Sequence, residues 1–249
     1  MPKYLVALEP LRSQLSYVKI DGDTVRIGAL TTLWEMQQSI LGKDKRFAGF
    51  SDVFHGFGTM ALRFYSTIGG NLASATQYND YITLLLVYDA KLKLRSVHGE
   101  RILSLEEFLI DKRKIDLKPN ELITEIFFKL PPENSSSSFI KFDRRRLLIA
   151  GVVTGAAYLE LDGDTIKDVR ISFDMVRDKR IPARARMTEE FLKGKKLSEE
   201  VLEEAAENVL VKEMKRITDW WTTAEYRMDM SKVVLKRNIL QAAKRIREG

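Results

Sequence analysis

The sequence predicts an α+β protein built from two domains, and three features support this fold class. Runs of strand-forming residues flank an Asp-Gly step at residues 21–24 and again at 162–165, and such a step is a strong signal of a β-hairpin. Residues 131–138 are two prolines, an acidic residue, an asparagine and four serines, a composition typical of a loop or linker. Two amphipathic stretches near the C-terminus add helices that can cover a small sheet. The predicted domains are residues 1–133 and 139–249.

The first half is expected to alternate between short strands and short helices. Residues 4–8 read as a buried strand. Thr32 and Glu35 have the spacing of a capping box, in which a hydroxyl and a carboxylate satisfy free N–H groups, so a helix is expected over residues 33–40. The apolar run at residues 82–87 fits either a buried helix or a strand, because periodicity does not decide for so few residues. Further strands are expected at residues 91–95 and 121–130.

The second half is expected to form a small sheet under two helices. Small and β-branched residues fill positions 149–161 and 166–173, on either side of the second Asp-Gly turn. Ser198 is a suitable N-cap, and the two acidic residues after it favour the positive end of a helix dipole, so a helix is expected to about residue 214. From about residue 223, apolar residues recur every three or four positions, which predicts a long amphipathic helix.

Composition limits the classes of function. The 249-residue chain has no cysteine and two histidines, so it can hold neither a disulfide nor a thiolate-bound cluster, and no metal site is expected in it. Its net charge of +6 comes from interspersed basic and acidic residues, whereas nucleic-acid-binding proteins tend to concentrate basic residues on one element. We therefore expect no nucleic-acid partner, and we expect Arg144, Arg145 and Arg146 to be solvated or to contact a partner protein.

The chain also lacks the features of a membrane or secreted protein. No apolar run approaches the roughly 20 residues that cross a bilayer, and the first residues lack the basic and apolar regions of a secretory signal. We therefore expect a cytoplasmic chain with no membrane partner.

The best candidate for a ligand site is a pair of adjacent glycines in the first half. Gly69 and Gly70 carry no Cβ, so the backbone can come into contact with a ligand there. Their N–H groups are expected to be free to point at an anion or at polar ring atoms. Asn71 and Ser74 add short hydrogen-bonding side chains, and Asp80 offers a carboxylate to hydroxyl groups. This set suits a nucleotide cofactor, while an ordinary tight turn is the alternative on the residues alone.

Several stretches, in order over nearly the whole chain, match the pattern of one family. They are residues 25–32, 62–63, 67–73, 89–90, 99–101 and 121–125, then Lys141 with Arg144 and Arg145, and residues 224–227. Through these stretches the sequence resembles the flavin-binding medium subunits of molybdenum hydroxylases. Aerobic carbon monoxide dehydrogenase, the archaeal aldehyde oxidoreductases and the corresponding segment of xanthine dehydrogenase belong to that family.

The resemblance implies a PCMH-type FAD-binding domain with a mixed sheet and helices, shortened at its N-terminus, and a C-terminal α+β domain. In the family, the glycine segment binds FAD, and a downstream aspartate and a lysine at the start of the second domain line the same cleft. The cofactor-binding residues are therefore expected to be Thr67, Ile68, Gly69, Gly70, Asn71, Asp80 and Lys141, together with Ser74. For Lys141 alone, a solvated cation near a linker is the alternative.

The resemblance also implies an oxidoreductase subunit that passes electrons on and carries no catalytic residue for substrate. A large partner subunit would hold molybdopterin and oxidise the substrate, and a small partner subunit would hold two [2Fe–2S] clusters. The chain would relay electrons from these clusters through FAD to a terminal acceptor. The alternative is a flavin-free, shortened relative that acts as a structural or interaction subunit.

The sequence departs from the family in three places. Family members carry, upstream of what is Met1 here, a βαβ segment with an Ala-Gly-Gly loop that wraps the FAD pyrophosphate. Residues 64–66 and 77–79 also differ from the more polar or smaller residues usual there. Because charge-assisted bonds to a diphosphate are strong, the missing segment predicts weak or absent FAD binding by this chain alone.

Overall fold

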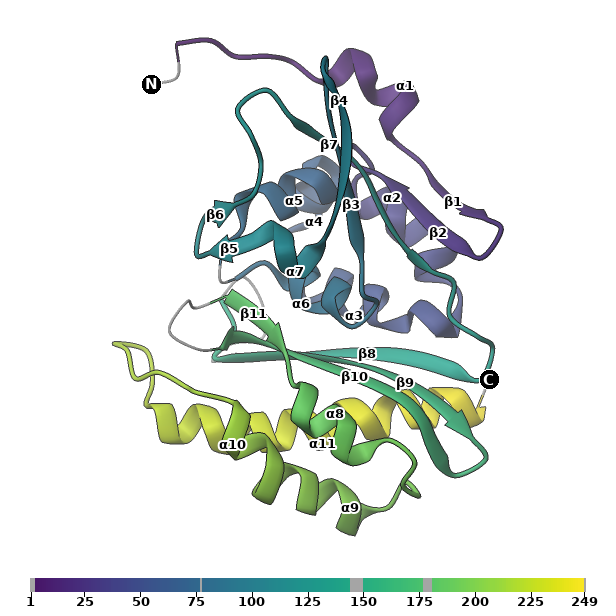
Figure 1. The fold of residues 1–249 in the computed structure, drawn as a ribbon, viewed down its shortest axis with the longest axis vertical. Helices are drawn as coiled ribbons and strands as arrows, with labels where there is room; N and C mark the ends of the chain where they lie inside the picture. The colour runs from purple at the N-terminus through teal and green to yellow at the C-terminus, as the bar shows by residue number, and fades with distance from the viewer. Residues whose placement is uncertain (1–2, 77, 144–149, 177–180, 249) are drawn as a thin grey trace.

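The computed structural model describes residues 3–76, 78–143, 150–176 and 181–248, which form alternating layers of sheets and helices (Figure 1). The first sheet has the strand order β1-β2-β7-β3-β4, and the second has the order β11-β10-β9-β8. Every pairing in both sheets is antiparallel. The α+β class predicted from the sequence is confirmed. The strands of the first sheet are β1 (Val18–Asp21), β2 (Thr24–Gly28), β3 (Lys91–Ser96), β4 (Gly99–Ser104) and β7 (Leu122–Lys129). Those of the second are β8 (Ser135–Phe142), β9 (Val153–Asp162), β10 (Thr165–Val176) and β11 (Ile181–Arg184), and β5 (Leu109–Asp111) pairs separately with β6 (Lys114–Ile115).

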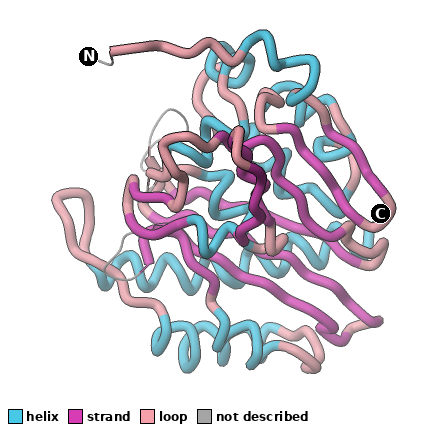
Figure 2. The backbone as a smooth tube through the Cα atoms, turned by 45° about the horizontal axis from the view of Figure 1, so that its top comes forward, coloured by secondary structure: helices cyan, strands magenta, loops and turns pink. Residues whose placement is uncertain are grey.

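Helices separate the two sheets and cover the outer face of the second (Figures 1 and 2). Helices α3 and α6 pack on β8 and β9 from the side of the first sheet, and α11 packs on the same two strands from the opposite side. The helices of the first half are α1 (Arg12–Leu15), α2 (Leu33–Gln38), α3 (Ala48–Gly56), α4 (Met60–Tyr65), α5 (Ile68–Ser74), α6 (Asp80–Leu86) and α7 (Leu105–Phe108), with 3-10 turns at Glu9–Leu11, Ile40–Gly42 and Lys45–Phe47. Those of the second half are α8 (Arg186–Leu192), α9 (Glu199–Glu204), a π-helical turn at Ala205–Leu210, α10 (Val211–Glu213) and α11 (Ala224–Glu248).

Local sequence signals account for most of these elements. Both Asp-Gly steps form hairpin turns, and their glycines have φ values of +60° and +57°, which favour glycine. Thr32 and Glu35 form the predicted capping box at the start of α2. The apolar run at residues 82–87, which periodicity left open, lies mostly in helix α6, and every residue of that helix is buried. Ser198 caps α9, as predicted, and α11 is the long amphipathic helix.

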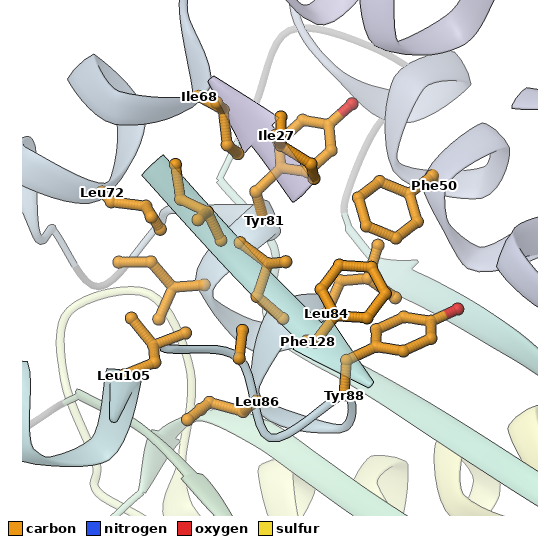
Figure 3. Close-up of a cluster of buried hydrophobic side chains, with 14 of the residues drawn as sticks. Ile27, Phe50, Ile68, Leu72, Tyr81, Leu84, Leu86, Tyr88, Leu105 and Phe128 are labelled. Carbon is orange, nitrogen blue, oxygen red and sulfur yellow. The ribbon is translucent and has the colours of Figure 1, made fainter. Parts of the chain in front are cut away.

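The second sheet serves two hydrophobic cores, one on each face. On β9, Ala156 and Tyr158 belong to the core of the first half, while Ala157 and Leu159 belong to the core under the C-terminal helices. This alternation follows from the two-residue period of a strand. In the first core, the Tyr88 and Phe128 rings lie 4.7 Å apart, beside Phe50 and Leu84 (Figure 3). The two halves of the chain are thus packed against each other through apolar side chains.

The predicted strand at residues 4–8 is wrong. Tyr4, Leu5 and Val6 are exposed, Leu5 to 92%, and the segment runs away from the first sheet without pairing with a strand (Figure 1). Apolar and β-branched residues favour an extended backbone, but a strand is stable only where a neighbour pairs with it and buries one face. The described residues supply no such neighbour.

The prediction of a loop at the four serines is also wrong. Ser135, Ser136, Ser137 and Ser138 are fully buried in strand β8. The sequence marks a break because serine is common in loops, but here small hydroxyl side chains let helices approach the strand from both sides. The Ser137 Oγ accepts hydrogen bonds from the Gly49 N–H of α3 (2.9 Å) and from the Tyr88 hydroxyl (2.6 Å). The Ser138 hydroxyl donates to the main-chain oxygen of Asn238 in α11, at 2.7 Å. The domain boundary at residues 133–139 stays a prediction.

We expect Ser137→Ala to lower the free energy of unfolding by about 1–3 kcal/mol, because buried donors lose their acceptor. Urea denaturation followed by circular dichroism measures this change. Ser13→Ala, at an exposed position in α1, is the control and should change stability by no more than about 0.5 kcal/mol. Equal effects of the two substitutions would contradict the role assigned to Ser137.

Candidate functional site

The predicted cofactor segment forms the start of helix α5, and its N–H groups are already bonded within the chain. Thr67 is the N-cap of the helix and also pairs with Thr32 in an isolated β-bridge. The Ile68 N–H donates to the Thr31 carbonyl (3.0 Å), and the Gly69 N–H donates to the Ala29 carbonyl (2.9 Å). The next two N–H groups bond to Thr67: the Gly70 N–H donates to its hydroxyl (3.2 Å) and the Asn71 N–H to its carbonyl (2.9 Å). The expectation of free N–H groups at the glycine pair is therefore wrong.

The two glycines have different surroundings. A Cβ on Gly69 would lie 2.8 Å from both the Cβ and the carbonyl oxygen of Ala29, which is closer than real side chains pack. A Cβ on Gly70 would meet only the Thr67 hydroxyl, at 3.1 Å, and Gly70 is exposed. Gly69 is therefore needed for packing against the end of β2, whereas Gly70 leaves main chain open to the outside.

Ile68 lies in the first core and supports the segment from behind. Its side chain is fully buried beside Leu72, and both point into the cluster drawn in Figure 3. Because its N–H is also bonded to Thr31, Ile68 offers neither its side chain nor its donor to a ligand.

The C-terminal end of α5 is tied to the start of α6 by Asn79, which lies in one of the segments where the sequence departs from the family. The Asn79 side chain donates to the Ser74 hydroxyl at 2.6 Å and to the main-chain oxygen of Asn71. Ser74 donates to the same Asn71 oxygen at 2.8 Å. The Asn71 Oδ1, in contrast, is buried and has no hydrogen-bond partner among the described residues. Of the predicted residues, Asn71 is thus the one with an unmet acceptor.

Lys141 and Asp80 come together across the boundary between the two halves. The Lys141 Nζ lies 3.0 Å from an Asp80 carboxylate oxygen, and the side chains are 13% and 5% exposed. Burial raises the pKa of Asp80, although the Lys141 ammonium opposes that shift. The alternative of a solvated lysine is wrong, because the side chain is enclosed and paired. A Cβ on Gly151 would lie 3.3 Å from the Lys141 Cγ, so a glycine there leaves room for the lysine stem.

Other features of the described residues offer less to a ligand. A cavity of about 490 Å³ opens at the turn between the two sheets, but three of its four basic side chains are already paired, Arg46 with Glu133, Lys167 with Glu160 and Arg170 with Asp89 and Asp168. No group of three potential metal ligands gathers in the part of the chain that the structure describes. None of the helices in that part combines the length and apolarity needed to cross a membrane. The predicted surface at Arg144, Arg145 and Arg146 lies outside the described residues.

An open glycine, an unmet buried acceptor and an enclosed lysine fit a cofactor that carries hydroxyl groups and negative charge. Comparison with known proteins gives the class of the chain, which is that of the FAD-binding subunits of oxidoreductases. The particular family follows from the sequence: residues 1–131 match the family described as the FAD binding domain in molybdopterin dehydrogenase, and the chain belongs to it. Residues 137–242 match the CO dehydrogenase flavoprotein C-terminal domain. FAD as the cofactor of this family, recognised from the sequence, is thereby confirmed.

Individual relatives agree with this assignment. The chain is 28% identical over 250 residues to the carbon monoxide dehydrogenase medium chain of Afipia carboxidovorans, covering 98% of this chain and 83% of that one. It is 27% identical over 164 residues to the nicotinate dehydrogenase FAD-subunit of Eubacterium barkeri, where the match spans 65% of this chain and 55% of that subunit. The fold is similar to that in the solved carbon monoxide dehydrogenase of Hydrogenophaga pseudoflava, with a TM-score of 0.85, 24% identity and coverage of 94% and 79%.

The unequal surroundings of the two glycines lead to a stability test. Gly69→Ala should destabilise the chain by about 1–3 kcal/mol, since the new methyl group overlaps Ala29. Gly70→Ala should stay within about 1 kcal/mol of the parent, because alanine favours a helix and only the Thr67 hydroxyl must move. Thermal and urea denaturation measure both changes, and a larger loss for Gly70→Ala would contradict the packing described above.

Proposed function

We propose that the chain binds FAD along the open side of helix α5 and at the Asp80–Lys141 pair, and relays electrons through it to a terminal acceptor. The observation that carries the proposal is the Asn71 Oδ1, which is buried without a donor among the described residues. Leaving a buried acceptor unpaired costs about 1–3 kcal/mol. A cofactor rich in hydroxyl and N–H donors would remove that cost.

Each residue has a definite part in this proposal. Gly70 leaves bare main chain against which a flat or extended group can lie. Asn71 accepts a hydrogen bond, and the exposed Ser74 hydroxyl is close to it. Lys141 supplies positive charge, and Asp80 fixes the position of its ammonium. Ile68 and Gly69 hold the segment against β2 from behind. Once bound, FAD would supply the redox chemistry, because it can take up and release electrons singly or in pairs.

The relatives support a role within a larger complex. The names of the similar proteins describe a medium chain and an FAD-subunit of dehydrogenases. We therefore assign substrate oxidation to a molybdopterin-binding large subunit and the supply of electrons to a small subunit with [2Fe–2S] clusters. We also propose that the chain and its partners work in the cytoplasm. The flavin-free alternative differs in one observable, since a subunit of that kind would not bind FAD.

Titration of the purified chain with FAD, followed by quenching of flavin fluorescence, tests the proposal. We expect binding that is saturable but weak, as the sequence analysis predicts for this chain alone. We expect Gly70→Ala to weaken it about tenfold or more further, because a methyl group would stand where the cofactor lies against main chain. Gly56→Ala is the matched control, since a Cβ at this last position of α3 meets nothing within 4 Å. Absence of FAD binding by the parent chain would favour the flavin-free alternative. Unchanged affinity of Gly70→Ala would remove α5 from the site.

A further inference from the structure

Three polar side chains form a row across one end of the second sheet, on the face that packs against α6. Lys141 of β8 is directly opposite Thr154 of β9. Ser172 of β10 is opposite Ala156, so Asp174, two residues further on, comes beside Thr154. The Thr154 N–H donates to the Asp174 carboxylate at 2.9 Å. The row therefore runs from a cation, through a hydroxyl side chain, to a carboxylate, and Asp80 of α6 completes it from above.

Asp174 is buried and only partly neutralised. It is 3% exposed, and the nearest cation is Arg216, whose Nη1 lies 4.0 Å from its Oδ1. The Arg216 guanidinium forms its hydrogen bonds with groups other than the Asp174 carboxylate. Its Nη1 donates to the main-chain oxygen of Asp174 at 2.6 Å, and its Nη2 donates to the Ser231 hydroxyl at 2.6 Å. The Arg216 Nε has no partner among the described residues.

The surroundings of Asp174 therefore hold charges of both signs. Lys141 and Arg216 are positive. Asp80, Asp174 and Asp143, which acts electrostatically on both Lys141 and Asp80, are negative. Burial raises the pKa of Asp174 to about 6, against the opposing effects of Arg216 and of the hydrogen bonds from Thr154. Burial also lowers the pKa of Arg216 to about 10, and Arg227 adds to that shift. Asp174 thus changes charge within the range of pH over which the protein can be studied.

We propose that Asp174 is a positioning residue that sets the net charge around Lys141, and so the affinity of this part of the proposed FAD site for an anionic cofactor. The proposal rests on the proposed function, because FAD is the anion concerned. An ionised Asp174, on the second strand from Lys141, adds a further negative charge beside Asp80 and Asp143, and this weakens the attraction of the Lys141 ammonium for a diphosphate. A neutral Asp174 leaves Asp80 and Asp143 against Lys141.

The sign of the pH dependence follows from this charge. Above a pH of about 6 Asp174 is mostly ionised, and below it the carboxyl group is mostly protonated. The diphosphate of FAD keeps its charge over this range. FAD should therefore bind more tightly at pH 5.5 than at pH 8, and the difference should disappear when the ionisable group at position 174 is removed.

FAD titration of the parent chain, Asp174→Asn and Asp168→Asn at both pH values tests the proposal. We expect the parent to bind about tenfold more tightly at pH 5.5, and Asp174→Asn to bind at both values about as tightly as the parent does at pH 5.5. Asp168 is a matched control, because it lies on the same strand, six residues or about 20 Å away. Burial opposes its ionisation, but hydrogen bonds from Lys193 and Arg170 lower its pKa, so it stays charged throughout. A pH dependence that persists in Asp174→Asn would overturn the proposal.

A second readout needs no cofactor, and it separates this proposal from the proposed function. The ¹⁵Nζ signal of Lys141, assigned with Lys141→Arg, should shift with a midpoint near pH 6 in the parent and in Asp168→Asn, and should show no such step in Asp174→Asn. Thr154→Val, which removes a hydroxyl that hydrogen-bonds to the ionised carboxylate, should move the midpoint to higher pH. Thr154→Val thus provides the test if Asp174→Asn does not fold. Failure of FAD to bind contradicts the proposed function alone. The role of Asp174 is contradicted if the Lys141 signal of the parent shows no step near pH 6, or if Thr154→Val leaves the midpoint of that step unchanged.

Discussion

The close packing of strand β8 between helices α3 and α11 is the constraint on which the rest of the structure depends. Only small side chains fit there: a Cβ on Gly49 of α3 would already lie 2.9 Å from the Ser137 Oγ. The hydroxyl groups of the strand satisfy main-chain groups of both neighbouring layers, so the tight contact leaves few buried polar groups unpaired. The same strand then fixes Lys141, because residues 137, 139 and 141 share one face.

The two halves are also tied together by charge. The Arg245 guanidinium of α11 reaches back to the Asp52 carboxylate of α3, with distances of 2.6 and 2.8 Å, and Asp52 accepts the N–H of Phe139 at 3.0 Å. Arg184 of β11 bonds to Asp89 after α6 and to Glu189 of α8. These partly or fully buried pairs hold the second sheet in one orientation above α6, which is the orientation that brings Lys141 to Asp80.

Signals that act over a few residues predicted much of this fold. The Asp-Gly hairpins, the Thr32–Glu35 capping box and the start of α9 at Ser198 depend only on neighbours in the chain. The serine strand could not be predicted in the same way, because Gly49 and Asn238, which explain it, are 88 and 100 residues away from their partners. The prediction of a strand at residues 4–8 is wrong for the converse reason, since the local pattern is that of a strand but none of the described residues pairs with it.

In the candidate site, too, some residues could be predicted from the sequence and others could not. Family resemblance identified the glycine segment, Asp80 and Lys141, but only the structure distinguishes the packed Gly69 from the open Gly70. Asn79 and Asp174 could not be selected from the sequence, because their roles depend on which strands and helices lie beside them.

The burial of β8 also has a consequence for biosynthesis. The ribosome completes the first half before it makes the serine strand, so the apolar face formed by α3 and α6 stays uncovered for that interval, and it is then that the nascent chain is most open to aggregation or to capture by chaperones.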